Sequence, residues 1–111
     1  MREAARNFVG TYDFTSFMAK GSKITDATRC VFYSDILCEG DMIIFKVAAD
    51  GFLYNMVRIM VGTLIDVARG VKSPEEVEAI IASKLRSNAG ATAPPHGLYL
   101  NEVSYNEYRG I

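Results

Sequence analysis

Cysteine and histidine are scarce in this sequence, and their scarcity excludes disulfide-stabilised and zinc-binding folds. The two cysteines, Cys30 and Cys38, lie in one predicted strand. At about 3.3 Å per residue their Cα atoms are roughly 26 Å apart, whereas a disulfide needs about 7 Å or less. Both are therefore expected to be buried, reduced thiols. Because there is one histidine and no CxxC motif, no zinc site is expected.

Net charge and long hydrophobic runs are also lacking. With 12 basic and 13 acidic residues the net charge is −1, which disfavours binding of nucleic acid by overall positive charge but allows a local basic patch. The most apolar stretch, residues 52–68, is interrupted by Asn55, Arg58, Gly62 and Asp66 and is too polar for a membrane span. The first residues carry acids and bases without an apolar segment, so no signal peptide is expected and the expected compartment is the cytoplasm.

What the sequence does have is enough apolar side chain for a core. Of its 111 residues, 50% are hydrophobic, which excludes a disordered chain and supports a single domain over residues 1–111. Ala4, Ala5 and Phe8 continue a helical spacing that starts at the first residue, and Gly10 is placed to end that helix. Because natural termini usually begin with a few loose residues, this helix predicts a chain cut from a longer one.

Alternating apolar residues predict an antiparallel hairpin in the middle of the chain. Its strands cover residues 28–38 and 42–49, joined by a turn at residues 39–41. Before the hairpin, Asp13 is expected to cap a short turn that places aromatic side chains in the core. The side chains predicted to be buried are Phe14, Phe17 and Met18 in the turn, Cys30, Phe32, Ile36 and Cys38 in the first strand, and Ile43, Phe45, Val47 and Ala49 in the second.

Two helices and a last strand follow the hairpin. A helix over residues 52–69, apolar on nearly all sides, is predicted to end at Gly70. Ser73 and Glu76 predict a capping box for a second helix, which would turn Val77, Ile80, Ile81 and Leu85 inward. Residues 98–105 form the last predicted strand, with a bulge near its middle. This order indicates an α+β fold with helices packed on one face of an antiparallel sheet.

Arg58 is the most informative candidate for a functional site. A guanidinium on a mostly buried helix keeps its charge and needs an anionic or hydrogen-bonding partner. The positions three and four residues away hold no carboxylate. The partner therefore comes from elsewhere in the fold or from outside the chain, and a purely structural pair with Asp35, Asp41 or Asp50 is the alternative.

Other candidates are weaker. Gly62, one turn after Arg58, lowers helix propensity by about 1 kcal/mol relative to alanine and suggests that a backbone or ligand passes close by. His96 follows two prolines, where a solvated turn residue is the simpler interpretation than a catalyst. The polar segment of residues 20–28 is expected to be a loop, either simply solvated or contacting a ligand through its lysines. No nucleophile constellation and no phosphate-binding glycine loop is recognisable.

Three separated segments resemble the C-terminal half of the TruA family of tRNA pseudouridine synthases. They are residues 51–62 (GFLYNMVRIMVG), residues 89–100 with 103–105 (AGATAPPHGLYL and VSY), and residues 13–17 (DFTSF) with the preceding helix. Tyr12 departs from the family pattern, in which histidine usually precedes the Asp-Phe pair. The resemblance covers nearly the whole chain, and the fold that it implies is the C-terminal domain of a pseudouridine synthase.

The resemblance implies isomerisation of uridine to pseudouridine in the anticodon stem-loop of tRNA, without a cofactor. In the family a catalytic Asp lies in a Gly-Arg-Thr-Asp type motif of the N-terminal half, and that motif does not occur here. The chain is therefore expected to be half of an enzyme, inactive alone. Its expected partners are tRNA, the N-terminal half and a second copy in a homodimer.

The family pattern also implies roles for individual residues. Arg58 matches the arginine that pairs with the catalytic Asp, which would lower the pKa of that carboxyl. Leu98 matches a leucine that packs against the target base. The remaining candidates for substrate contact are Asn55, Arg86, Lys20, Lys23 and Arg29. The competing hypotheses are a non-catalytic RNA-binding or assembly module with the same fold, and a structural domain unrelated to RNA.

Overall fold

The computed structural model describes residues 2–19, 21, 26–40, 42–53 and 55–93. The predicted strand at residues 98–105 lies outside these ranges, as do Lys20, Lys23, His96 and Leu98. Within them no helix is long and apolar enough to cross a membrane.

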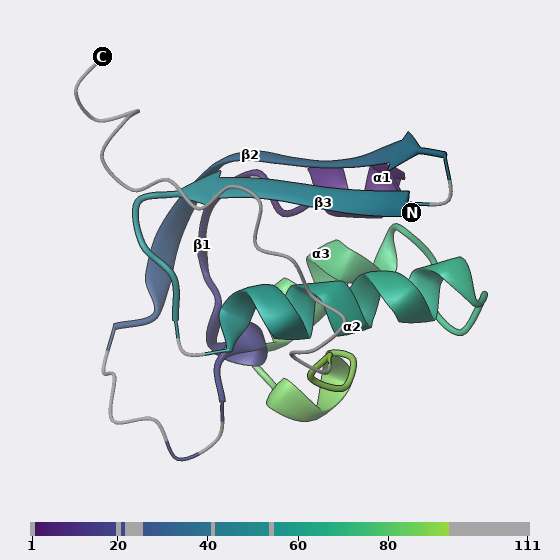
Figure 1. The fold of residues 1–111 in the computed structure, drawn as a ribbon. Coiled ribbons are helices and arrows are strands. Elements are labelled where there is room, and N and C mark those ends of the chain that lie inside the picture. Colours follow the sequence, from purple (N-terminus) through teal and green to yellow (C-terminus); the bar gives the residue numbers. More distant parts are fainter. Residues whose placement is uncertain (1, 20, 22–25, 41, 54, 94–111) are drawn as a thin grey trace.

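A three-stranded antiparallel sheet in the order β1-β2-β3 is the frame of the fold (Figure 1). β2 (Thr28–Glu39) and β3 (Met42–Ala49) form the predicted hairpin, in which Glu39 pairs with Met42. β1 (Gly10–Asp13) pairs with the start of β2 and was not predicted. Its four residues lack apolar alternation, and its two central side chains are exposed, so the sequence carries no strand signal there.

An irregularity in β2 changes which of its side chains face the core. The register shifts between Val31 and Tyr33, which is the behaviour of a β-bulge. Val31 is buried before the shift and Ile36 after it, whereas Cys30 and Phe32 are only half-buried. The prediction of one buried parity along this strand is therefore wrong at its start, and Cys30 is a half-buried free thiol rather than a buried one.

The second strand follows the prediction except at the hairpin tip. Val47 and Ala49 are buried, and Phe45 packs against the core. Ile43, in contrast, is 63% exposed. It lies next to the turn, where neither α2 nor α3 covers the hairpin in Figure 1.

The helices differ from the prediction mainly at their ends. α1 (Arg2–Arg6) is the predicted N-terminal helix and packs against β2. α2 (Met56–Ala68) starts later than predicted, because Asn55 adopts a left-handed backbone with φ of 62°. α2 ends as predicted at Gly70, whose φ of +78° suits a residue without a side chain. α2 and α3 (Glu76–Ser83) lie together on one side of the sheet (Figure 1).

The capping box predicted for α3 is absent. The helix begins without a side-chain cap; instead, the Ser73 and Pro74 carbonyls accept the first amide hydrogen bonds, from Glu76 and Val77. Leu85 lies beyond the end of α3 and is 55% exposed, so its predicted inward position is wrong. The other three inward positions, Val77, Ile80 and Ile81, are buried as predicted.

The core lies between the sheet and the helices, and the aromatic side chains of the first 17 residues are central to it. Phe17 packs edge-on against Phe8, with ring centroids 5.1 Å apart, and against Phe14 at 6.2 Å. All three rings are fully buried, which confirms the core role predicted for Phe14 and Phe17. The largest fully buried side chains contributed by α2 are Met56, Ile59, Met60 and Leu64.

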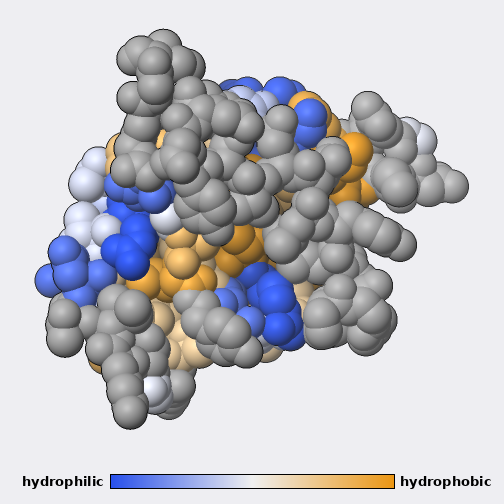
Figure 2. All heavy atoms as spheres, turned by 60° about the vertical axis from the view of Figure 1, so that its left-hand side comes forward, coloured by the Kyte–Doolittle hydropathy of each residue, from blue (hydrophilic) through white to orange (hydrophobic). Residues whose placement is uncertain are grey.

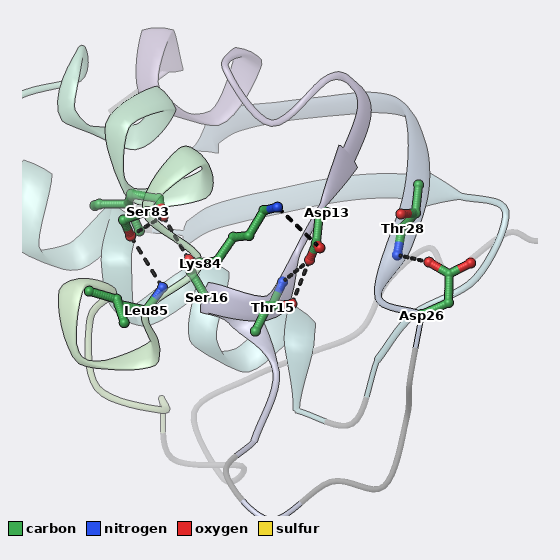
Figure 3. Close-up of polar contacts among 9 residues, drawn as sticks. Asp13, Thr15, Ser16, Asp26, Thr28, Ser83, Lys84 and Leu85 are labelled. Carbon is green, nitrogen blue, oxygen red and sulfur yellow. Dashed lines mark hydrogen bonds and ion pairs between the residues drawn. The ribbon is translucent and has the colours of Figure 1, made fainter.

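Polar contacts join the short helix η1 (Thr15–Phe17) to its surroundings (Figure 3). The Asp13 carboxylate accepts hydrogen bonds from the Thr15 backbone N–H and hydroxyl, so this residue starts the turn as predicted. The buried Ser16 hydroxyl donates to the Ile80 carbonyl at 2.6 Å and ties η1 to α3. Lys84 Nζ lies 3.9 Å from Asp13 Oδ2 and adds a weak ion pair.

Candidate functional site

A loop that crosses α2 organises the surroundings of Arg58. We call residues 89–93, which follow the short helix η2 (Arg86–Asn88), the crossing segment. Its backbone lies directly on the helix at Gly62: a Cβ built there would be 1.6 Å from the Ala91 carbonyl oxygen. A Cβ at Gly90 would be 2.6 Å from the backbone of Gly62 and Thr63. The close backbone approach predicted for Gly62 is present, and both contact positions require glycine.

Hydrogen bonds hold the crossing segment at this position. The Gly90 N–H donates to Thr63 Oγ1 at 2.9 Å, and the Thr63 hydroxyl donates to the Ile59 carbonyl within α2. The Ala93 N–H donates to the Arg58 carbonyl at 3.0 Å. Two points of α2 more than one turn apart are thus bonded to the same loop, which fixes the loop along the helix.

The Arg58 side chain is oriented by the same loop and by the helix start. Its Nε donates to the Ala93 carbonyl at 2.8 Å, and its Nη1 donates to Asn55 Oδ1 at 3.1 Å. The left-handed backbone of Asn55, immediately before α2, places that amide within reach of the guanidinium. Asn55, predicted as a substrate-binding residue, contacts Arg58 in this structure.

No carboxylate in the described ranges forms an ion pair with Arg58. Of the alternatives considered, Asp35 is paired with Arg2 and Arg6, and Asp50 accepts a hydrogen bond from the Cys30 N–H. Asp41 lies outside the described residues. Neutral acceptors occupy Nε and Nη1, and Nη2 makes no hydrogen bond to a described residue. The half-buried guanidinium therefore keeps both its charge and donor capacity for an anionic group.

Arg86 braces the crossing segment from its other side. Its Nη1 donates to the Gly90 carbonyl at 2.9 Å and its Nη2 to Thr92 Oγ1 at 3.2 Å. Arg29, the other described candidate for phosphate contact, lies on β2 with its Nη1 donating to the carbonyls of Asp26 and Thr28. The structure therefore brings Asn55, Arg58 and Arg86 into one hydrogen-bonded network, and their roles toward RNA remain predictions.

Two members of this network were not found from the sequence. Thr63 is fully buried, and a hydroxyl in an otherwise apolar helix next to Gly62 was the available signal. Ala93 contributes only backbone groups, which no residue type can reveal.

The strongest electrostatic perturbation lies away from this network, on β2. The Arg2 guanidinium, hydrogen-bonded to Asp35 at 3.0 Å, lowers the pKa of that carboxyl from 3.8 to about 2, with help from the Ile36 N–H and from Arg6. This cluster joins α1 to the sheet. Asp35 therefore has a structural partner within the chain, unlike Arg58.

Apolar side chains also reach the surface. Figure 2 shows hydrophobic surface between strongly hydrophilic areas on one face of the molecule. The exposed large apolar residues in the described ranges are Val9, Tyr12, Tyr33, Ile43, Ile65, Val71 and Leu85. They come from three strands, α2 and several loops. Single exposed residues of this kind are ordinary, so they do not by themselves define a second site.

The comparison with protein families decides the identity of the fold. A family model described as tRNA pseudouridine synthase matches residues 4–106. The chain belongs to the tRNA pseudouridine synthase family. The residues that carry the TruA-family resemblance, including Arg58, Gly62 and the crossing segment, lie within the matched region.

Curated relatives agree with this membership of the tRNA pseudouridine synthase family. A tRNA pseudouridine synthase A of Anoxybacillus flavithermus is 48% identical over 106 residues, which are 96% of this chain and 43% of the relative. The proteins of the same name from an Exiguobacterium species and from Bacillus subtilis are 47% and 46% identical. The chain thus spans less than half the length of these relatives.

No group of three or more potential metal ligands occurs among the described residues. The chemistry available in this part of the chain is that of oriented hydrogen-bond donors. A fixed cation with a free donor edge can hold a carboxylate or another oxyanion in one orientation.

Proposed function

We propose that this chain acts as the C-terminal half of a tRNA pseudouridine synthase and provides one wall of the cleft in which uridine is isomerised. The single observation that carries the proposal is Arg58: an oriented guanidinium on a buried helix without a carboxylate partner among the described residues. The N-terminal half, with the catalytic Asp, would supply that partner. Family membership and the 43% share of a relative's length support the division into halves.

In the proposed reaction Arg58 is a positioning group for the catalytic carboxylate. Opposite charge at short range lowers the pKa of a carboxyl, so the Asp would be ionised and aimed at the nucleotide. The glycosidic bond then breaks, the base turns, and its C5 is joined to the sugar. Arginine suits this task because its planar guanidinium can hold a carboxylate at two points, whereas lysine offers a point charge.

Partners and location complete the proposal. tRNA is the proposed substrate, with uridines of the anticodon stem-loop as the targets, and Leu98 would pack against the target base. A homodimer is proposed from the family resemblance. The cytoplasmic location expected from the sequence remains a prediction.

A chimeric enzyme tests the proposed function. The chain would replace the matching C-terminal region of the Bacillus subtilis relative, to which it is 46% identical. Pseudouridine formation is measured as release of tritium from C5 of labelled uridine in tRNA. We expect the chimera to be active and the 111-residue chain alone to be inactive. An inactive but folded chimera, or conversion by the chain alone, contradicts the proposal.

Substitution of Arg58 in the chimera tests its role. We expect Arg58→Lys to lower kcat about 10- to 100-fold, which corresponds to the ~1.5–3 kcal/mol of a charge-assisted hydrogen bond, and to change the Kd for tRNA little. Arg69→Lys, at an exposed position after α2, is the matched control and should leave both values unchanged. Equal losses of kcat and of tRNA affinity would instead assign Arg58 to a phosphate contact. Binding of tRNA with no turnover in any variant would favour the non-catalytic RNA-binding module.

A further inference from the structure

Arg86 uses its guanidinium within the protein. Both terminal nitrogens donate to the crossing segment, one to the Gly90 carbonyl and the other to the Thr92 hydroxyl. The residue is half-buried, and it begins η2, immediately before the segment that it holds. A phosphate-binding arginine is expected to direct its donors outward. The donor geometry of Arg86 is instead that of an internal brace.

The segment held by Arg86 is the one that orients Arg58. Ala93 follows Thr92 directly, and its carbonyl accepts the hydrogen bond from Arg58 Nε at 2.8 Å. The Ala93 N–H in turn donates to the Arg58 carbonyl at 3.0 Å, so this residue is bonded to Arg58 at two points. A shift of the crossing segment would therefore move the acceptor that fixes the guanidinium.

The remaining contacts anchor the middle of the segment and leave its end to Arg86. Gly90 is fixed by Thr63 and by the close packing on Gly62. Thr92 has no other side-chain hydrogen bond within the described residues, so Arg86 is the side chain that determines its position. A small displacement of a positioning group can lower a rate strongly without changing substrate affinity.

We propose that Arg86 is a positioning residue that acts through the crossing segment to fix the Arg58 guanidinium for catalysis. This inference deepens the proposed function and rests on it, because Arg58 must take part in the reaction for its orientation to matter. It replaces the phosphate-contact role expected for Arg86 from the sequence.

Kinetics of the chimeric enzyme test the inference. We expect Arg86→Gln to lower kcat about tenfold, within the range for residues coupled through one hydrogen-bond network, with little change in the Kd for tRNA. Arg86→Lys should recover part of the loss, because an ammonium can still reach one of the two acceptors. In an Arg58→Lys background Arg86→Gln should have little further effect, since the orientation that it protects has already lost its value.

A second variant leaves the charge of Arg86 in place. Thr92→Val removes one acceptor only, and we expect a smaller loss of kcat in the same direction, again without loss of tRNA affinity. Arg69→Gln, at an exposed position, is the matched charge control and should change neither value. If Arg86 instead contacts phosphate, Arg86→Gln should weaken tRNA binding, reduce the slope of log K against log salt by about 0.7–0.9, and act additively with Arg58→Lys. That result, or an unchanged kcat, overturns the inference.

Amide hydrogen exchange separates failure of the inference from failure of the proposed function. The Ala93 N–H is bonded to the Arg58 carbonyl, so Arg86→Gln should accelerate its exchange in the chimera relative to that of amides in β2 and β3. An inactive wild-type chimera would refute the proposed function, whereas unchanged exchange at Ala93 would refute the brace even in an active enzyme.

Discussion

Replacement of Gly62 by alanine is the sharpest test of the contact between α2 and the crossing segment. In an isolated helix this change is favourable by about 1 kcal/mol, because alanine has the higher helix propensity. Here the added methyl would lie 1.6 Å from the Ala91 carbonyl oxygen, less than half of an ordinary van der Waals separation. The colliding atom belongs to the backbone, so no side-chain rotation relieves the clash.

The magnitude follows from what must move. To admit the methyl group, the crossing segment has to leave the helix and lose three hydrogen bonds: Gly90 to Thr63, Ala93 to the Arg58 carbonyl, and Arg58 Nε to Ala93. At about 1 kcal/mol each these contribute roughly 3 kcal/mol. Subtracting the gain in propensity of about 1 kcal/mol leaves a net loss of about 2 kcal/mol in the free energy of unfolding.

Urea unfolding of the 111-residue chain measures this loss. Gly51→Ala is the matched control: its Cβ would lie 3.4 Å from Arg29 Nε, an ordinary contact, and we expect it to be neutral or to stabilise by up to about 1 kcal/mol. If Gly62→Ala were as stable as the wild type or more so, the helix propensity of α2 would dominate and the backbone contact at Gly62 would be refuted.

Three further predictions concern stability. Because Arg2 lowers the pKa of Asp35 to about 2, this carboxylate stabilises the fold above pH ~4, and the contribution is lost as the pH falls from about 4 to 2; Asp35→Asn should abolish that part of the pH dependence of unfolding. The buried Ser34 hydroxyl has no hydrogen-bond partner, so Ser34→Ala should stabilise by about 1 kcal/mol in thermal unfolding. The same change at Ser16, whose hydroxyl donates to the Ile80 carbonyl, should destabilise by about 1 kcal/mol, and equal signs would contradict both assignments.

The middle of the fold was predictable from the sequence because one periodic signal dominates each element. The antiparallel hairpin, α2 and α3 were all expected from apolar spacing. The missed features lie where that signal is absent or interrupted. β1 is held by pairing with β2 rather than by its own apolar residues, and the shift between Val31 and Tyr33 exchanges the two faces of β2, which no period-two rule anticipates.

The candidate site was predictable to the extent that it violates the rules of a buried helix. Arg58 and Gly62 are unfavourable on an apolar helix, and this conflict pointed to an unseen partner and to a close backbone. The partner of Gly62 proved to be the crossing segment. The hydrogen bonds that orient Arg58 were not predictable, because the acceptor is the backbone carbonyl of Ala93, and a backbone group has no signature in the sequence.

The division of labour along α2 explains why one helix can serve both the core and the site. Its core face, with Ile59, Met60 and Leu64, is fully buried and fixes the helix in the domain. Gly62 on the other face lets a loop lie at backbone distance, and this closeness lets a main-chain carbonyl reach Arg58 at 2.8 Å. A larger residue at position 62 would hold the loop away and leave the guanidinium to flexible or solvent contacts. The glycine thus acts on the orientation of Arg58 from one turn away, and Gly62→Ala in the chimera should lower kcat together with stability.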